Sequence, residues 1–423
     1  MTAFLIILSL FAVLLVGIPI AFALGGMGAV LIILDGLNPI IVTQALYSSV
    51  DSFILLAVPL FLLMSNILLK GGVGRDLFAA VQSWVGHWPG GLAVATVISC
   101  AIFAAISGSS IATAATIATV AIPEMTSRGY QRPFVLGLLA AGGTLGILIP
   151  PSVPLIVYGV LTEQSIVSLF LAGVAPGLLL AGLFIAFSML YAAYTKAFDP
   201  LPKASWEERK AASIRALPSV GLALIIFIGL YGGVFTPTEA AGVGFVLAII
   251  ITALMLRTLT WQLFGEAVIG SMRTTVTIFL IVAGAKIFAK AITLYRIPHE
   301  ISGLIIDNFD QVGSFIFVVC VALLILGFFL ESLSMLLIVV PVLFPALLSM
   351  GIDPVWFGIV FMLMIEIALI TPPVGLNLFV IQAVGKATLG EVTKGVLPFL
   401  AIMLLTVLLI YLFPQIVLFI PFG

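Results

Sequence analysis

Long apolar runs fill nearly the whole sequence, and the longest polar stretch between them is 196–215. The runs lie near 3–34, 40–69, 92–122, 133–160, 166–195, 216–233, 238–256, 274–295, 313–349, 354–384 and 395–422. About 20 apolar residues in helical conformation cross a bilayer core. Only 8% of the residues are charged, against roughly 25% in soluble domains. The runs therefore predict an all-α polytopic membrane protein that faces the lipid bilayer.

The same features set aside several classes of protein. The net charge is −1, so the chain has no basic footprint for nucleic acid. Cys100 and Cys320 both lie within apolar runs, where we interpret them as small hydrophobic residues rather than metal ligands or a disulfide. No H-E-x-x-H motif and no nucleotide-binding loop occurs, so we expect neither an enzyme nor a self-powered pump. A secondary transporter is the leading class, with a channel and an intramembrane enzyme as alternatives.

The two halves of the sequence share landmarks at one constant offset of 222 residues. The matching pairs are Pro123 and Pro345, Gly129 and Gly351, and Pro150 and Pro372. In each half one apolar run is interrupted by small or polar residues, and the next run breaks at a Pro-Pro pair. Paired interruptions in corresponding places of two halves are typical of transporter binding sites.

Broken backbone at membrane depth is tolerated only inside protein or beside water. We therefore predict two re-entrant helical hairpins, 92–122 and 313–349, and two discontinuous helices, 133–160 and 354–384. The first inverted half would be 1–195. Residues 196–233 would form a cytoplasmic linker and an inverting span, and the second inverted half would be 234–423. The segment 257–273 has an amphipathic pattern that predicts a separate interfacial helix.

The distribution of charge orients the two halves. The first hairpin is flanked by the basic or imidazole side chains Lys70, Arg75, His87, Arg128 and Arg132, and the second by the acidic residues Asp307, Asp310 and Asp353. Positive charge stays on the cytoplasmic side. We therefore expect the first hairpin to enter from the cytoplasm and the second from outside. The first run, 3–34, would be a retained span, because it is too long for a signal-peptide core and lacks a basic start.

Two motifs carry a resemblance to a known family. The stretch from Ile106 to Tyr158 contains I-S-G-S-S-I-A-T-A-A-T and G-I-L-I-P-P-S-V-P, and residues 366–377 read E-I-A-L-I-T-P-P-V-G-L-N. Both resemble the large membrane subunit of tripartite ATP-independent periplasmic (TRAP) transporters. The resemblance implies an elevator mechanism, sodium as the coupling ion with no resident cofactor, and the bacterial inner membrane as the location. It also implies a small four-helix membrane subunit and a periplasmic substrate-binding protein as partners. The expected substrate is a small organic acid, a C4-dicarboxylate first and a sialic acid or other sugar acid as the alternative.

Sodium needs several oxygen ligands, which unwound carbonyls and hydroxyls at a helix break supply without adding charge. The sodium coupling that the resemblance implies is compatible with one such set of ligands in each half. The candidate ligands are Ser107 and Ser109 facing Gly146, Ile149 and Pro151, and Gly327 and Glu331 facing Ala368, Thr371 and Pro373. Glu331 and Ala368 depart from the resembled family, whose members usually have Asp and Gly there.

An anionic substrate needs donors and positive potential, which hairpin tips provide through helix amino termini. The candidate substrate residues are Ser110, Ser152, Glu331 and Asn377. An acid at membrane depth is costly and marks function by default, which is why Glu331 is included.

Some polar residues have a structural alternative. Thr113, Thr116 and Thr119 would bond the carbonyl four residues back rather than hold a ligand. Glu366 is open between a functional role, helix capping and pairing with Lys286 or Lys290. For the two lysines we favour structural pairing or contact with a partner subunit.

Overall fold

The computed structural model describes residues 2–195, 201–297, 300, 303, 312–372 and 374–423. Asp307, Asp310 and Pro373 lie outside these described residues. The helices of the first half are α1 (Thr2–Leu15), α2 (Ile20–Leu34), α3 (Ile40–Val50), η1 (Phe53–Leu56), α4 (Ala57–Lys70), α5 (Val73–Val85), α6 (Gly91–Ser107), α7 (Ser110–Ser127), α8 (Arg132–Leu148), α9 (Val153–Thr162) and α10 (Ile166–Thr195). The linker and inverting span contain α11 (Trp206–Tyr231). The second half follows with α12 (Pro237–Ile250), η2 (Ile251–Met255), α13 (Trp261–Leu294), α15 (Val312–Leu326), α16 (Ser332–Ser349), α17 (Pro354–Leu369), α18 (Leu376–Gly385), α19 (Leu389–Leu412) and α20 (Gln415–Phe422).

The predicted class, an all-α polytopic membrane protein, is confirmed. Within the described part of the chain, seven helices are long and apolar enough to cross a bilayer, or eight if the bent pair α8 and α9 counts as one more. Large apolar side chains such as Leu178, Ile228 and Val276 are more than half exposed on the helix surfaces. Such a surface suits lipid, since a soluble protein rarely exposes large contiguous apolar area.

The sequence repeat reappears in the helix bounds and in the packing. Helices α7 and α16 begin and end at positions that differ by the same 222 residues. Contacts between helices also come in matching pairs: α2 packs on α13 as α12 packs on α4, and α7 packs on α18 as α16 packs on α9. The two halves are therefore interlocked, because the second hairpin helix of each half packs on the helix that follows the break in the other half.

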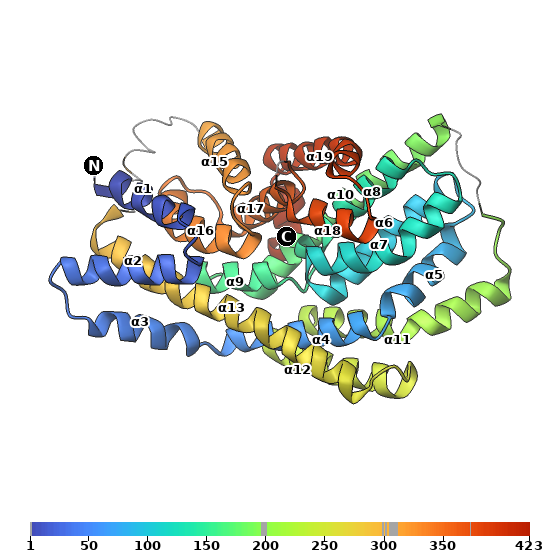
Figure 1. Cartoon of the computed structure of the whole chain (residues 1–423), viewed down its shortest axis with the longest axis horizontal. Helices are drawn as coiled ribbons and strands as arrows, with labels where there is room; N and C mark the ends of the chain where they lie inside the picture. The colour runs from blue at the N-terminus through green and yellow to red at the C-terminus, as the bar shows by residue number, and fades with distance from the viewer. Residues whose placement is uncertain (1, 196–200, 298–299, 301–302, 304–311, 373) are drawn as a thin grey trace.

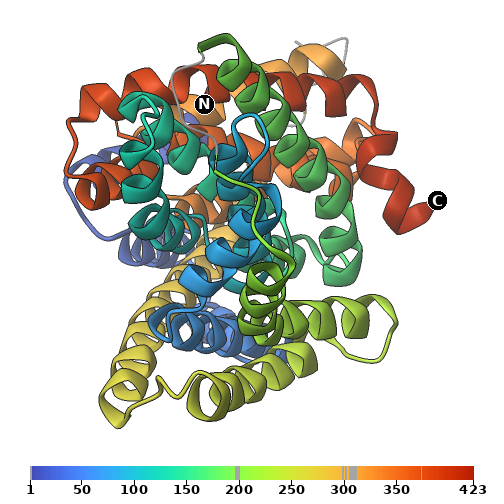
Figure 2. The same cartoon turned by 90° about the vertical axis from the view of Figure 1, so that its right-hand side faces the viewer.

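Two layers of helices enclose the centre of the molecule. Helices α2, α3, α4, α12 and α13, here called the outer layer, lie together along one side, with the long α13 crossing it (Figure 1). Helices α6–α9 and α15–α18, here called the core helices, lie above them in the same view. Figure 2 shows α11–α13 (green to yellow) on the opposite side of the molecule from α19 (red).

Two expectations about element bounds are wrong. The run 3–34 is not one span, because Gly17 takes a left-handed φ of +90° and Pro19 precedes a new helix, α2. The segment 257–273 is not a separate interfacial helix, since α13 continues from Trp261 to Leu294 without a break. The polar stretch after 195 becomes helical at Trp206, where Ser205 and Glu208 form a capping box.

Candidate functional site

The first hairpin tip lies directly against the first helix break. A Cβ on Gly108 would come within 2.5 Å of the Pro151 carbonyl oxygen, and one on Gly146 within 2.6 Å of the Ser109 carbonyl oxygen. Gly108 also has a left-handed φ of +59°, which only glycine adopts without strain. Glycines at both positions thus allow the tip and the break to approach backbone to backbone.

The Pro150-Pro151 pair removes the donors that would close the last turn of α8. In a continuous helix the amides of residues 150 and 151 would donate to the carbonyls of Gly146 and Ile147. Proline has no amide hydrogen. Since α8 ends at Leu148, these carbonyls have no intrahelical donor, and α9 restarts at Val153 after a bend of 40°. Carbonyl oxygens of this kind are available to a cation.

The hydroxyls at the first tip mainly hold the tip together. The Ser107 and Thr113 hydroxyls lie 2.8 Å apart, and Thr113 Oγ1 also donates to the Ser109 carbonyl at 2.8 Å. Ser109 Oγ accepts from the Ala112 amide as the N-cap of α7. The structural interpretation of Thr113 is confirmed, as is that of Thr116, which bonds the Ala112 carbonyl at 2.7 Å. For Thr119 the expected acceptor is wrong, because its hydroxyl bonds the Thr116 carbonyl, three residues back, at 2.7 Å.

The second tip meets the second break in a different way. Gly327 has its backbone packed on the Ala368 methyl group, with no room for a side chain of its own. The Ala368 carbonyl accepts the Thr371 amide at 3.2 Å, and Thr371 Oγ1 donates to the Ile367 carbonyl at 2.6 Å. The Ile367 carbonyl also accepts the Ile370 amide at 3.2 Å, so both of its lone pairs are used, whereas the Ala368 carbonyl keeps a second lone pair. The first break therefore leaves freer carbonyls than the second.

Both hairpin tips and both breaks border one small cavity of about 160 Å³. Ser109 and Ser110 line it from the first tip, and Glu331 from the second. Glu331 is the N-cap of α16, where its Oε1 accepts from the Ser334 amide at 3.3 Å and hydroxyl at 3.1 Å. The amino termini of α7 and α16 thus open on the same space, where their partial positive charge favours an anion.

Behind the first tip lies a buried polar cluster. Ser110 Oγ donates to Glu366 Oε2 at 3.1 Å and accepts from Asn377 Nδ2 at 2.6 Å. Glu366 Oε1 and Asn377 Oδ1 are buried without a protein donor. Within the described residues neither Lys286 nor Lys290 bonds Glu366, so the proposed pairing with these lysines is wrong.

The predicted substrate residues divide into two groups. Ser110 and Glu331 line the cavity. Asn377 and Ser152 do not, because both are fully buried: Asn377 is bonded to Ser110, and Ser152 accepts the Leu155 amide as the N-cap of α9. Of the predicted sodium ligands, Pro373 lies outside the described residues.

The sequence did not indicate the far wall of the cavity. Leu62 of α4 and Thr274 and Ile278 of α13 close it from the outer layer. These residues occur in ordinary apolar runs and carry no motif. The repeat is the one sequence signal that could have indicated them, because α13 is the counterpart in the second half of α3 and α4 in the first.

These features define a class of protein. A helical membrane protein with two related halves, whose broken helices and hairpin tips meet at one central cavity, has the architecture of a secondary transporter. The sequence profile of the tripartite ATP-independent periplasmic transporter, DctM component, matches residues 7–416. The chain therefore belongs to the TRAP transporter family as its large, multi-pass component of the bacterial inner membrane, and it is a transport protein rather than an enzyme.

Individual relatives extend over most of the chain. The C4-dicarboxylate TRAP transporter large permease protein DctM of Pseudomonas aeruginosa is 39% identical, over 89% of this chain and 88% of that protein. The sialic acid TRAP transporter large permease protein SiaM of Vibrio cholerae is 35% identical, over 96% and 95%. Among solved structures, the YdaH transporter of Alcanivorax borkumensis aligns with a TM-score of 0.62 over 86% of each chain at 13% identity, which shows a shared fold.

Proposed function

We propose that this chain imports an organic acid coupled to sodium, and that the acid binds in the cavity between the two hairpin tips. The convergence of both tips and both breaks on that cavity is the observation that carries the proposal. Sodium would be held by the carbonyls of Gly146, Ile149 and Pro151 with Ser107 and Ser109, and by Gly327, Glu331, Ala368 and Thr371 in the second half. Bound cations would supply positive charge that no lysine or arginine provides among the described residues of the cavity lining.

A C4-dicarboxylate is the proposed substrate. The cavity of 160 Å³ is smaller than the roughly 300–1,000 Å³ usual for sites of drug-sized ligands, and it favours a small acid over a sugar acid. The name of the relative with 39% identity agrees with this choice. A sialic acid is the alternative, supported by the name of the relative with 35% identity. Two sodium ions with a dianion would be electroneutral, whereas with a monoanion they would move one charge, worth about 2.3 kcal/mol per 100 mV.

Movement in this proposal is of the elevator type. The core helices would carry the cavity past the outer layer, since Leu62 and Thr274 of that layer close the cavity by contact rather than by covalent continuity. A periplasmic binding protein would deliver the substrate, and a small four-helix membrane subunit would pack beside the chain. The tripartite organisation of the family supports the existence of two further components.

Uptake by proteoliposomes tests the proposal. The liposomes would contain this chain with its small membrane subunit and a periplasmic binding protein, with and without an inward sodium gradient. The substrates would be labelled succinate, malate and N-acetylneuraminate. We expect uptake of a dicarboxylate that needs both sodium and the binding protein. Sodium-independent flux that ignores the binding protein would reject the coupling, and uptake of N-acetylneuraminate alone would select the alternative substrate.

A further inference from the structure

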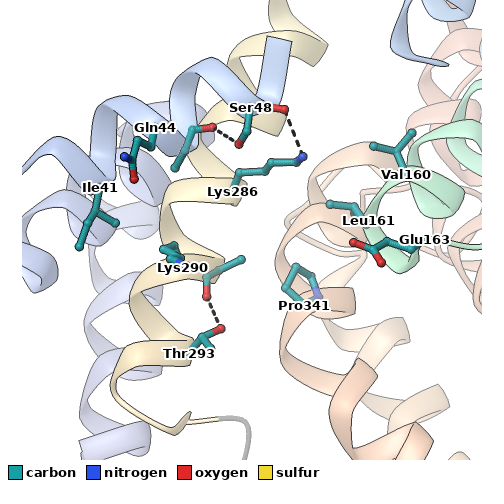
Figure 3. A pocket seen from close by; sticks show the side chains of 12 residues that line it. Ile41, Gln44, Ser48, Val160, Leu161, Glu163, Lys286, Lys290, Thr293 and Pro341 are labelled. Atoms are coloured by element: carbon teal, nitrogen blue, oxygen red, sulfur yellow. Dashed lines mark hydrogen bonds between the residues drawn. The ribbon is translucent and has the colours of Figure 1, made fainter. Parts of the chain in front are cut away.

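A second and larger cavity lies between the outer layer and the core helices. Its volume is about 520 Å³, and it is bordered by α3 and α13 on one side and by the end of α9 and the middle of α16 on the other (Figure 3). It shares no lining residue with the cavity between the hairpin tips. The proposed function does not use it.

The charges around this cavity are unbalanced. Lys286 and Lys290 lie one turn apart on α13, and Glu163 lies across the cavity from Lys286 (Figure 3). Among the described residues, the lining thus contains two ammonium groups and one carboxylate. Lys286 Nζ donates to the Ser48 carbonyl at a long 3.4 Å, although an ammonium has three donors. Within the described part of the chain neither lysine takes part in an ion pair.

Cationic side chains inside a membrane-spanning helix cost roughly 2.5–3.5 kcal/mol at the bilayer centre and are kept where they face a watery path for ions or substrates. Lys286 and Lys290 both fall within the apolar span of α13. The free donors and the excess positive charge around one cavity match the chemistry of a carboxylate, which accepts such hydrogen bonds with both oxygens.

The same two helices connect the two cavities. Val153 of α9 and Ser332 of α16 line the small cavity, whereas Val160 and Pro341, further along these helices, line the large one. At 1.5 Å per residue the separation along the helix is about 10 Å on α9 and about 13 Å on α16. A small acid in the large cavity would therefore be two to three helical turns from the space between the tips.

We propose that Lys286 and Lys290 form a carboxylate-binding vestibule that holds the organic acid before it enters the site between the hairpin tips. This inference rests on the proposed function for the identity of the acid. The positive charge of the cavity does not depend on the proposed function, and it can be measured separately. A lipid headgroup phosphate would satisfy the same two ammonium groups, so the experiment must distinguish it from a soluble carboxylate.

Charge-selective labelling measures the vestibule directly. Ser48 is exposed and lines the cavity, so Ser48→Cys, in a chain with Cys100→Ala and Cys320→Ala, places a thiol there. The rates of labelling by an anionic and by a cationic methanethiosulfonate would be compared in phosphatidylcholine vesicles. We expect the anionic-to-cationic ratio to fall at least threefold when Lys286→Gln and Lys290→Gln are added. Lys394→Gln on α19 is the matched control and should leave the ratio unchanged.

Succinate is the probe for occupancy. It should slow the anionic reagent at least twofold in the lysine-containing chain and have no effect in the double glutamine variant. A second series with phosphatidylglycerol in the vesicles tests the lipid. Protection by phosphatidylglycerol without protection by succinate would overturn the vestibule in favour of a lipid site, and an unchanged labelling ratio in the double variant would overturn any anion site.

Uptake separates this inference from the proposed function. In a chain that transports succinate, the double glutamine variant should raise KM at least fivefold with kcat within twofold of the parent, whereas Lys394→Gln changes neither. An equal loss of kcat would contradict a vestibule role. If the parent shows no sodium-coupled uptake, the proposed function fails, while protection by succinate still decides the vestibule.

Discussion

Gly108 makes the most demanding contact of the first hairpin tip, and Gly108→Ala tests it. The variant would pay about 1–2 kcal/mol for an alanine in the left-handed region. Its methyl group would also lie 2.5 Å from the Pro151 carbonyl oxygen, so tip and break must separate by about 0.9 Å to reach the 3.4 Å of an ordinary contact. Overpacking of this kind costs about 1–3 kcal/mol more.

Gly351→Ala is the matched control. Gly351 has a similar φ of +69°, but a methyl group there would meet no atom within 4 Å. Gly351→Ala therefore has only the cost of an alanine in the left-handed region. Thermal unfolding in detergent micelles would compare the two variants, and uptake would be measured against sodium concentration. Because the separation moves the Ser109 and Pro151 carbonyls apart, we expect the half-maximal sodium concentration to rise at least tenfold for Gly108→Ala and less than twofold for Gly351→Ala. A tenfold rise corresponds to about 1.4 kcal/mol.

Equal stability or equal sodium dependence of Gly108→Ala and Gly351→Ala would contradict this description of the tip. If both variants lose the same stability, the tip is not packed on the break as described. If Gly108→Ala is less stable than its control but keeps its sodium dependence, the contact is real and the sodium site lies elsewhere.

The remaining predictions concern three other positions. Ser110→Ala leaves two buried polar partners unsatisfied, at about 1–3 kcal/mol each. Its melting temperature should therefore fall well below that of the control Ser99→Ala, which removes a buried hydroxyl without a partner among the described residues. Equal melting temperatures would contradict the cluster. Glu331→Gln keeps an oxygen to cap α16 but loses the charge, so uptake should fall at least tenfold at unchanged melting temperature, and parental uptake would make Glu331 structural. Lys203→Cys, in the exposed linker, should resist an impermeant maleimide in intact cells, and ready labelling would overturn the orientation.

Local chemistry made part of the site predictable. Pro150-Pro151 removes donors wherever it occurs, so the first break could be located without knowing what surrounds it. The expectation that Ser109 faces Gly146 is also met, since a Cβ on Gly146 would lie 2.6 Å from the Ser109 carbonyl oxygen. The bond of Thr113 to the Ser109 carbonyl was also predictable, since it lies within one helical turn.

Partners distant in sequence were not predictable. Ser110 and Asn377 are 267 residues apart, and both appeared to be equivalent donors to the substrate, yet Asn377 is buried behind Ser110. Helix α17 is buried all round from Val355 to Leu369, so its apolar pattern has no face that could indicate what Glu366 meets. The surroundings of Lys286 were not predictable either, because α9 and α16 of the opposite layer form the other wall of its cavity.

By itself the sequence determined that this chain is a helical membrane protein with two related halves, and where each half breaks. Scarcity of charge, span length and missing proline donors act within one segment, so they can be read along the chain. The tertiary structure alone decided that both tips share one cavity, that Leu62 and Thr274 close it, and that two lysines line a second cavity. These outcomes depend on which helix faces pack across hundreds of residues, and an apolar helix carries no local signal of that choice.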